Sequence, residues 1–189
     1  MAKKSKKAKK ADKAESMRAE GSNPHVLRAA DIAAKQQPFS HPWNPKSELI
    51  GVLLGKALGL KRTGVAIARI PAGKESFVPH AHHREEEWLY ILMGEGAALI
   101  GEDEVRVGAG DFIAFPAPQV THHLKNVGGD DLVYLMGGEH AKMDVVDFPT
   151  LGRRTVRLGD ETTVYEVDAA AAFPMSQGGP KQSKKDKKR

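Results

Sequence analysis

The sequence predicts an all-β fold, an antiparallel sandwich or barrel built from short strands. Between Gly64 and Gly138, runs rich in β-branched and aromatic residues recur at a spacing of roughly ten residues. Glycine, proline and acidic residues typical of turns separate these runs. This spacing favours a sandwich or a barrel over an α/β fold.

The predicted elements follow one another along the chain. The alanine-rich stretch 27–35 indicates a short helix before the strands. Residues 48–60, "ELIGVLLGKALGL", fit either a strand or a turn of helix. Strands are expected in the stretches 63–73, 85–96, 96–108 (a hairpin), 110–118, 121–138 (two strands) and 162–168.

Residues 88–93, "WLYILM", form a predicted strand that is apolar on both faces. One face can fill the interior of a barrel, whereas the other needs a cover. Flanking chain or a partner subunit can supply that cover, so we expect a homodimer.

Length and composition predict one domain between two tails. The 189 residues suffice for a single compact domain, expected at 23–174. The Lys-rich segments 1–22 and 175–189 are predicted to be disordered. The chain has no cysteine, which excludes disulfides, thiolate nucleophiles and iron–sulfur clusters. Any bound metal therefore needs nitrogen and oxygen ligands.

The distribution of charge argues against a nucleic-acid-binding domain. Residues 1–14 carry seven lysines against Asp12, and residues 181–189 carry six basic groups against Asp186. Together these two segments carry a net charge of +11. Because the net charge of the whole chain is +5, the rest of the chain carries −6. We expect at most weak, non-specific contact of the tails with nucleic acid, because a binding domain places its basic residues on the folded surface.

The N-terminal "MAKKSKKAKK" is not followed by the apolar run that a signal peptide needs. The longest apolar run, 49–60, is interrupted by Lys56 and is too short to cross a bilayer. We therefore expect a cytoplasmic protein without a membrane segment.

A histidine cluster precedes the central strand, in "PHAHHREEEWLYILMG". His80 and His82 lie two residues apart, so they project from the same face of an extended segment, and His83 points the other way. Glu87 shares its face with the inward side chains of the next strand. A carboxylate at the mouth of an apolar interior is costly unless a cation compensates it, so a metal is expected there. Glu86 is an alternative ligand if a bulge shifts the register by one residue.

A second cluster, "THHLKN", supplies a third histidine. His122 shares a face with Leu124, and His123 shares one with Lys125, so His122 is predicted to point inward. His83 and His123 are predicted to lie behind the ligands or in solvent, and the glutamates at 85 and 86 to form a solvated turn. A mixed set of imidazoles and one carboxylate suits manganese, iron, nickel, cobalt or zinc. The predicted metal ligands are His80, His82, Glu87 and His122.

These motifs resemble those of the cupin superfamily, in particular its small single-domain bacterial members of the sugar-phosphate-isomerase-like type. The first motif, a glycine followed by His-x-His, a glutamate and a second glycine, is matched by Gly73, His80, His82, Glu87 and Gly94. The second motif is matched by the residues Gly110, Pro116, His122 and Asn126. The six-residue gap between Glu87 and Gly94 favours Glu87 over its neighbours as the ligand.

The resemblance implies a double-stranded β-helix, a jelly-roll barrel that binds one divalent transition metal near one mouth. The chain departs from the second motif in two ways. Pro118 occupies the usual glycine position, and His122 comes one residue later than is common. Because proline cannot adopt a positive φ, the turn before His122 is expected to differ in shape.

The sequence leaves three functions open. The first is an isomerase-like enzyme whose metal acts as a Lewis acid on a small polar substrate, a sugar phosphate or a hydroxy or keto acid. Arg69, and Lys61 or Arg62, are candidates for binding its phosphate or carboxylate. Tyr90 and Tyr134 are, besides the glutamates, the candidates for a base.

The second function is an iron-dependent dioxygenase with a pocket lined by Met93, Phe112 and Phe115. The third is a non-catalytic module that binds a small ligand or senses a metal. No helix-turn-helix pattern accompanies it, which weakens a repressor role. Fold alone does not decide among these functions.

Overall fold

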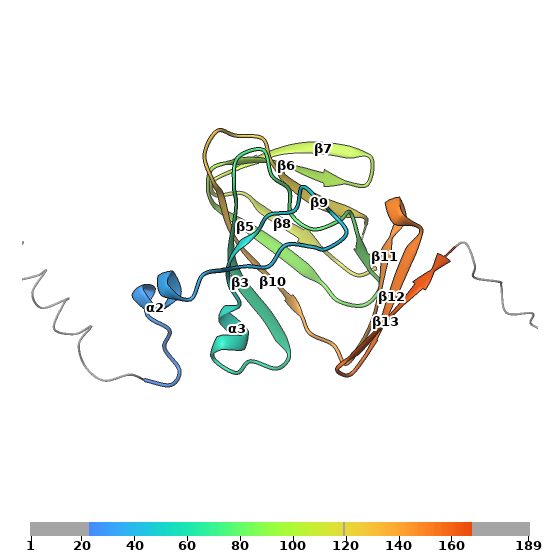
Figure 1. The fold of residues 1–189 in the computed structure, drawn as a ribbon, viewed down its shortest axis with the longest axis horizontal. Helices are drawn as coiled ribbons and strands as arrows, with labels where there is room; N and C mark the ends of the chain where they lie inside the picture. Colours follow the sequence, from blue (N-terminus) through green and yellow to red (C-terminus); the bar gives the residue numbers. More distant parts are fainter. Residues whose placement is uncertain (1–22, 119, 168–189) are drawn as a thin grey trace, which may run out of the picture.

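The structure is a computed structural model that describes residues 23–118 and 120–167. The predicted tails, and residues 168–174 of the predicted domain, lie outside the described residues. The described chain is mostly antiparallel β-structure, which confirms the all-β prediction (Figure 1). The strands are β1 (Gln37–Pro38), β2 (Ile50–Val52), β3 (Thr63–Ile70), β4 (Ala81–His82), β5 (Glu87–Met93), β6 (Glu95–Ile100), β7 (Asp103–Gly108), β8 (Phe112–Phe115), β9 (His122–Asn126), β10 (Leu132–Glu139), β11 (Met143–Phe148), β12 (Arg153–Leu158) and β13 (Glu161–Glu166).

The strands form three sheets. Six strands pair in the order β1-β2-β3-β10-β5-β8, four in the order β13-β12-β11-β4, and three in the order β7-β6-β9. The buried core lies between the first and the third of these sheets and is built from inward residues such as Ile70, Ile91, Leu124 and Leu132. In Figure 1 the β11–β13 strands lie at one side of this barrel, next to β4.

The few helical segments agree with the sequence. The expected N-terminal helix is α2 (Ala29–Ala34). The ambiguous stretch 48–60 contains both of the structures that it fitted, since β2 is followed at once by the single turn α3 (Leu54–Ala57). A 3-10 turn, η1 (Pro149–Leu151), joins β11 to β12. None of the helices in the described ranges is long and apolar enough to span a membrane.

Besides the two-residue strands β1 and β4, the longer strands β11 and β12 were not expected from the sequence. Both are rich in charged residues, which a single sequence presents as turn or surface. In the sheet these charges face one another across the pair, for example Arg154 Nε and Asp147 Oδ1 at 2.5 Å. Cross-strand charge pairs of this kind support strand pairing. β11 also pairs with β4, and it thereby reaches the histidine motif.

The end of β5 departs from the predicted alternation. Ile91 is fully buried, as expected, but Met93 is exposed. The cause is a shift in register, because Val133 of β10 pairs with Met93 and Tyr134 already pairs with Ile91. The following Gly94 has φ +86°, and a Cβ there would lie 2.5 Å from the carbonyl oxygen of Asp131. Glycine is therefore required where β5 turns into β6.

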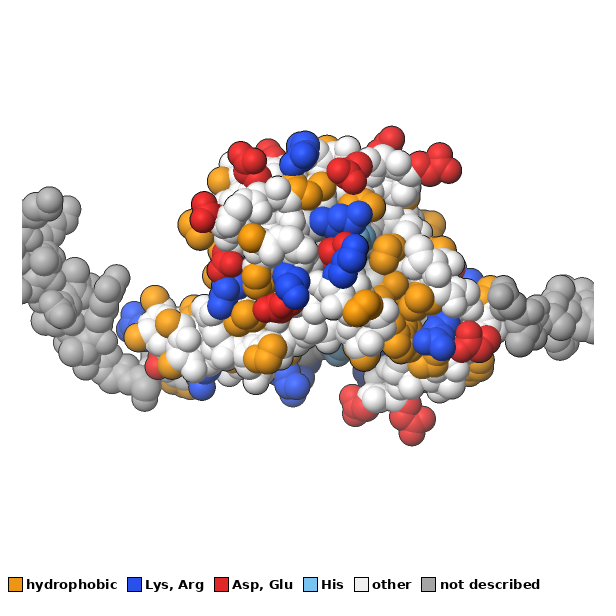
Figure 2. Space-filling view, turned by 45° about the horizontal axis from the view of Figure 1, so that its top comes forward, with side chains coloured by type: hydrophobic (Ala, Val, Ile, Leu, Met, Phe, Trp, Pro, Cys, Tyr) orange, Lys and Arg blue, Asp and Glu red, His pale blue; other side chains and the backbone are white. Residues whose placement is uncertain are grey.

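The surface carries charges of both signs. Figure 2 shows lysine, arginine, aspartate and glutamate side chains interspersed on one face, with hydrophobic groups among them. Exposed apolar residues include Tyr90 and Leu92 of β5 and Phe112 of the neighbouring strand β8. The homodimer, the cytoplasmic location and the contact of the tails with nucleic acid stay predictions.

Candidate metal centre

Three sheet segments bring the motif residues together. His82 lies on β4, Glu87 begins β5, and His122 begins β9. His80 and His122 form an isolated antiparallel bridge, in which each backbone N–H donates to the carbonyl oxygen of the other residue. The ring of Phe115 stacks on the ring of His122, with centroids 3.8 Å apart. The backbone bridge and this stacking fix where the imidazoles point.

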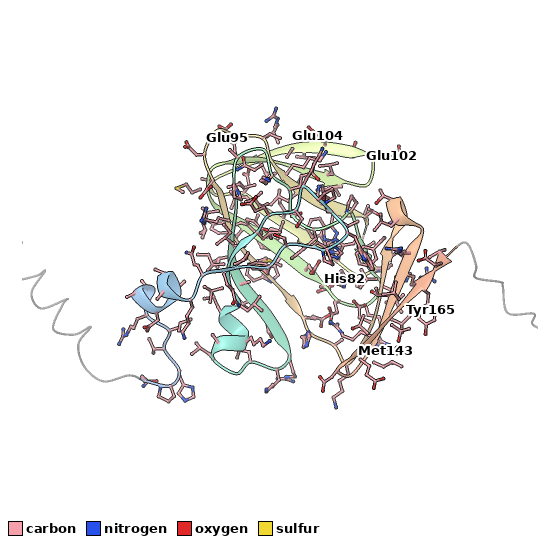
Figure 3. All side chains as sticks on the ribbon, in the orientation of Figure 1. His82, Glu95, Glu102, Glu104, Met143 and Tyr165 are labelled. Carbon is pink, nitrogen blue, oxygen red and sulfur yellow. The ribbon has the colours of Figure 1, made fainter. Side chains whose placement is uncertain are left out.

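The three imidazoles converge on one carboxylate oxygen. The Nε2 atoms of His122, His82 and His80 lie 3.2, 3.6 and 3.8 Å from Oε2 of Glu87. His80, Glu87 and His122 alone already form a group whose ligand atoms lie within 4.8 Å of one another. Figure 3 shows His82 on the inner side of the β11–β13 strands.

The opposite nitrogen of each ring is held by a hydrogen-bond acceptor. Nδ1 of His80 lies 2.8 Å from the carbonyl oxygen of Val78, and Nδ1 of His122 lies 3.1 Å from that of Val120. Nδ1 of His82 lies 2.5 Å from Oδ2 of Asp144. An acceptor at Nδ1 places the proton there and leaves a lone pair on Nε2. This is the arrangement in which a histidine binds a metal.

The surroundings favour the protonation states that a metal needs. Burial would raise the pKa of Glu87, but the contacts of its carboxylate with His122, His80 and His82 lower that pKa well below its usual range. Burial lowers the pKa of His122, although the neighbouring Glu87 opposes this shift. An ionised carboxylate beside neutral imidazoles is the state that coordinates a metal ion. The residues present therefore fit a transition metal with nitrogen and oxygen ligands.

The neighbouring residues of the first motif lie elsewhere. Glu86 is exposed, and its backbone N–H donates to Glu139. His83 is exposed and pairs with Oδ2 of Asp147 at 2.8 Å. The prediction for Glu85 was wrong, because this residue is 4 % exposed and not solvated. It forms an ion pair with Arg157 of β12, and it also accepts the backbone N–H of Ala141.

His123 was predicted to lie behind the ligands or in solvent, and it is buried rather than in solvent. Its Nε2 lies 3.2 Å from Oε2 of Glu75, and its Nδ1 lies 3.4 Å from the hydroxyl of Ser76. It thus stabilises the segment before the first motif. The turn before His122 contains a cis peptide bond, Ala117–Pro118.

The two predicted catalytic candidates do not reach the centre. Arg69 forms an ion pair with Asp131, at 2.6 Å between Nη1 and Oδ2. Tyr90 is 39 % exposed and faces outward from β5. Tyr134 is buried and lines the same cavity as the centre, and burial raises the pKa of its hydroxyl, so this group stays protonated and is not a base.

Asp144 is the site residue that sequence reasoning missed. It is 1 % exposed, and it accepts hydrogen bonds from His82 and from the backbone N–H of Arg84. With His82 and Glu85 it forms a second group of clustered ligand atoms. In the sequence Asp144 stands next to Val145 and Val146, in a stretch outside the predicted strands, so no face could be assigned to it.

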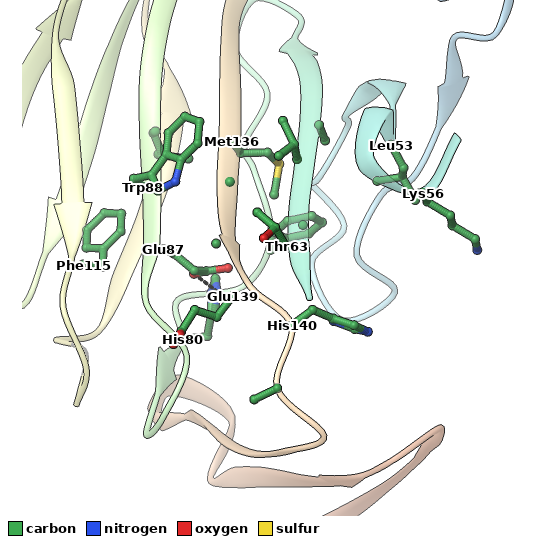
Figure 4. A pocket seen from close by; sticks show the side chains of 18 of the residues that line it. Leu53, Lys56, Thr63, His80, Glu87, Trp88, Phe115, Met136, Glu139 and His140 are labelled. Carbon is green, nitrogen blue, oxygen red and sulfur yellow. Dashed lines mark ion pairs between the residues drawn. The ribbon is translucent and has the colours of Figure 1, made fainter. Parts of the chain in front are cut away.

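A cavity of about 940 Å³ opens beside the centre. His80, Glu87 and His122 line one end of it, and Figure 4 shows Glu87 with His80 and Phe115 on the side away from Leu53 and Lys56. Of the predicted binding residues, Lys61 lines the cavity and Arg62 does not. Of the predicted apolar lining, only Phe115 is present, because Met93 and Phe112 are exposed on other surfaces.

Comparison with known proteins identifies the class. The family model described as the cupin domain matches residues 66–138, which include both histidine motifs. A crystal structure from Acidithiobacillus ferrooxidans, provisionally named a sugar phosphate isomerase, superposes with a TM-score of 0.76 at 32 % identity. The match covers 80 % of this chain and 97 % of that one. The chain belongs to the cupin superfamily.

Two further proteins are similar to this chain. The oxalate-binding protein of Thermotoga maritima is 29 % identical over 110 residues, which are 58 % of this chain and 89 % of that protein. A structure from Silicibacter pomeroyi, named a sugar phosphate isomerase of the cupin superfamily, has a TM-score of 0.61 at 21 % identity. The match covers 66 % of this chain and 80 % of that one, and at this identity it supports the fold alone.

Proposed function

We propose that this chain is a mononuclear metal-dependent enzyme of the cupin class. His80, His82, Glu87 and His122 would bind one divalent transition metal per subunit. The observation that carries the proposal is the convergence of three Nε2 atoms on one Glu87 oxygen, at 3.2 to 3.8 Å. Acceptors on all three Nδ1 atoms support the same assignment.

The proposed reaction is isomerase-like and acts on a substrate that offers two oxygen atoms, such as a sugar phosphate or a hydroxy or keto acid. When bound, the metal would supply Lewis-acid polarisation of these oxygens and so acidify an adjacent C–H bond. Tyr134 would donate a hydrogen bond from its buried hydroxyl, and the apolar walls would exclude water. The names of the Acidithiobacillus and Thermotoga proteins agree with this substrate class.

The first test is elemental analysis by mass spectrometry of untagged protein that has never met a nickel column. We expect near-stoichiometric manganese, nickel, cobalt or zinc, and loss of this metal in His82→Ala. His83→Ala is the matched control, because His83 pairs with Asp147 and not with Glu87. It should retain the metal. No metal in the wild type, even after reconstitution, would overturn the proposal.

The metal and the chemistry also separate the alternatives. Near-stoichiometric iron would favour the dioxygenase, and the apolar cavity wall is compatible with its substrates. If the metal is present, exchange of substrate C–H protons in deuterium oxide should be visible by NMR with a panel of aldose phosphates and hydroxy acids. Bound metal without exchange or oxygen consumption would favour the non-catalytic binding module.

A further inference from the structure

The cavity beside the proposed centre is large for a small polar substrate. Its volume of about 940 Å³ lies near the upper end of small-molecule sites, about 300–1,000 Å³. A water molecule accounts for about 30 Å³ of liquid, so a hydroxy acid as small as glycolate would displace only a few waters. A substrate that consisted of its metal-binding head alone would leave most of the cavity filled with water.

The walls between the metal end and α3 are mainly apolar. Leu89 of β5 and Met136 of β10, which also pack on the buried core, line this middle part together with Ala66 of β3. Because water forms few hydrogen bonds against such walls, an apolar ligand gains free energy by displacing it.

The end of the cavity at α3 combines apolar and basic side chains. Leu53 and Leu60 line it although they are 40 % and 54 % exposed. Lys56 and Lys61 line the same end. No ion pair is formed by either lysine within the described part of the chain, and the lining residues between 53 and 66 include no acid.

The acidic residues of the lining lie at a different place. Glu139 ends β10, and Asp160 lies in the turn between β12 and β13, where Lys142 also lines the cavity. Oε2 of Glu139 already accepts the backbone N–H of Glu86. The end at α3 is therefore the one that carries uncompensated positive charge.

We infer that the substrate is an elongated acid with three parts. A head with two oxygens faces the metal, an apolar or aromatic body lies along Leu89 and Met136, and a second anion, a carboxylate or phosphate, lies at Lys56 and Lys61. This inference rests on the proposed function for the head group alone. The apolar body and the second anion are inferred from the residues that line the cavity.

The test measures binding of four probes to the metal-reconstituted full-length chain by isothermal titration calorimetry. Glycolate carries the head alone, 2-hydroxyoctanoate adds an apolar body, and 2-hydroxyoctanedioate adds a terminal anion. Each buried methylene contributes about 0.8 kcal/mol, so 2-hydroxyoctanoate should bind at least about tenfold more tightly than glycolate. The diacid should bind about tenfold more tightly again, and this second gain should fall with added salt. The fourth probe, octanedioate, lacks the hydroxyl.

Four variants test which cavity residues contribute to each gain in binding affinity. Leu60→Ser should weaken the two long hydroxy acids about fivefold and leave glycolate unchanged, because it removes apolar contact only. Leu58→Ser is its control, since Leu58 is similarly exposed but does not line the cavity. Lys61→Met should abolish the preference for the diacid, whereas Arg62→Met should retain it. Residues 58, 60, 61 and 62 are all exposed, so these substitutions should not prevent folding.

The outcomes separate this inference from the proposed function. If glycolate binds only with metal and the longer acids bind no more tightly, the inference is wrong and the metal centre stands. If glycolate does not bind but octanedioate binds equally with and without metal, the body and anion assignments stand and the proposed function fails. A diacid preference that is equal in Lys61→Met and Arg62→Met would overturn the assignment of the second anion.

Discussion

Oδ2 of Asp144 lies 2.5 Å from Nδ1 of His82, although 62 positions separate the two residues in the chain. The pairing of β11 with β4 makes this contact, because it brings Asp144 next to the first histidine motif. The aspartate is held in turn by the backbone N–H of Arg84, at 3.1 Å from Oδ1. A buried carboxylate in this position fixes both the tautomer and the direction of the imidazole.

Replacement of Asp144 should weaken metal binding without removing any ligand. We expect Asp144→Asn to lower metal affinity about tenfold and Asp144→Ala up to about 100-fold, because His82 loses its charged acceptor. Competition with a chromophoric chelator measures this. Asp147→Asn, on the same strand, is the control, since Asp147 contacts His83 and Arg154. Equal affinities in all these variants would contradict a positioning role for Asp144.

Periodicity predicted the parts of the site that depend on neighbours in the sequence. The alternation in "HAH" and "THHL" placed His80, His82 and His122 on inward faces, and the structure brings them to Glu87. Asp144 could not be found in this way, because its role depends on a pairing between distant strands. A single sequence does not show which charged segments pair.

The same limit explains the error at Glu85. In the local run of three glutamates it has the character of a solvated turn, and nothing nearby indicates a compensating charge. Arg157, 72 positions later, supplies that charge from β12. Arg69 and Tyr90 were chosen as candidates, and lie away from the centre, for a related reason. A strand pattern assigns a side chain to one face of a sheet, but it does not show which residues of that face line the cavity.

The apo protein should lose stability as pH falls below about 6.5, the usual pKa of histidine. Burial lowers the pKa of three histidines, although a neighbouring carboxylate opposes this shift in two of them, at His122 and His123. These are His41, His122 and His123. Because the folded state keeps them neutral while the unfolded state binds protons, the stability that they contribute is present above pH 6.5. It is lost as pH falls through their lowered folded pKa values.

Thermal unfolding of chelator-treated protein between about pH 8 and about pH 5 checks this dependence. His123→Gln should flatten the curve, because one of the three groups no longer takes up a proton on unfolding. Its Ser76 and Glu75 contacts make some loss of stability at neutral pH unavoidable. A stability that rises from pH 7 toward pH 5 would contradict the prediction.

The buried ion pair of Glu85 and Arg157 should matter more than any exposed pair. Glu85→Ala leaves Arg157 largely buried without its partner and should cost about 3 kcal/mol of unfolding free energy. Glu166→Ala breaks the exposed pair with Arg153 and should cost less than about 1 kcal/mol. Urea unfolding measures both values.

A double variant tests the cause of this loss. Glu85→Leu combined with Arg157→Met removes both charges and should recover most of the stability lost in Glu85→Ala, because no buried charge remains unpaired. If the double variant is as unstable as Glu85→Ala, packing or the hydrogen bond to Ala141 is the larger contribution.

Gly137 should be required for the position of Trp88 over β10. A Cβ at Gly137 would lie 2.3 Å from Cζ2 of Trp88, closer than any real contact, so the ring must move if alanine is introduced. We expect Gly137→Ala to cost about 1–3 kcal/mol of unfolding free energy through overpacking. Because the ring of Trp88 must move, its fluorescence should shift as well. A Trp43→Phe background makes Trp88 the single tryptophan, since the chain has two.

Gly129→Ala is the matched control for this substitution. A Cβ at Gly129 would meet no atom within 4 Å, so that variant should stay within about 0.5 kcal/mol of the parent and keep its emission spectrum. Loss of stability with unchanged Trp88 emission would show that the backbone of β10 moves instead of the ring. If Gly137→Ala matches Gly129→Ala in both measurements, Trp88 does not pack against β10 at Gly137.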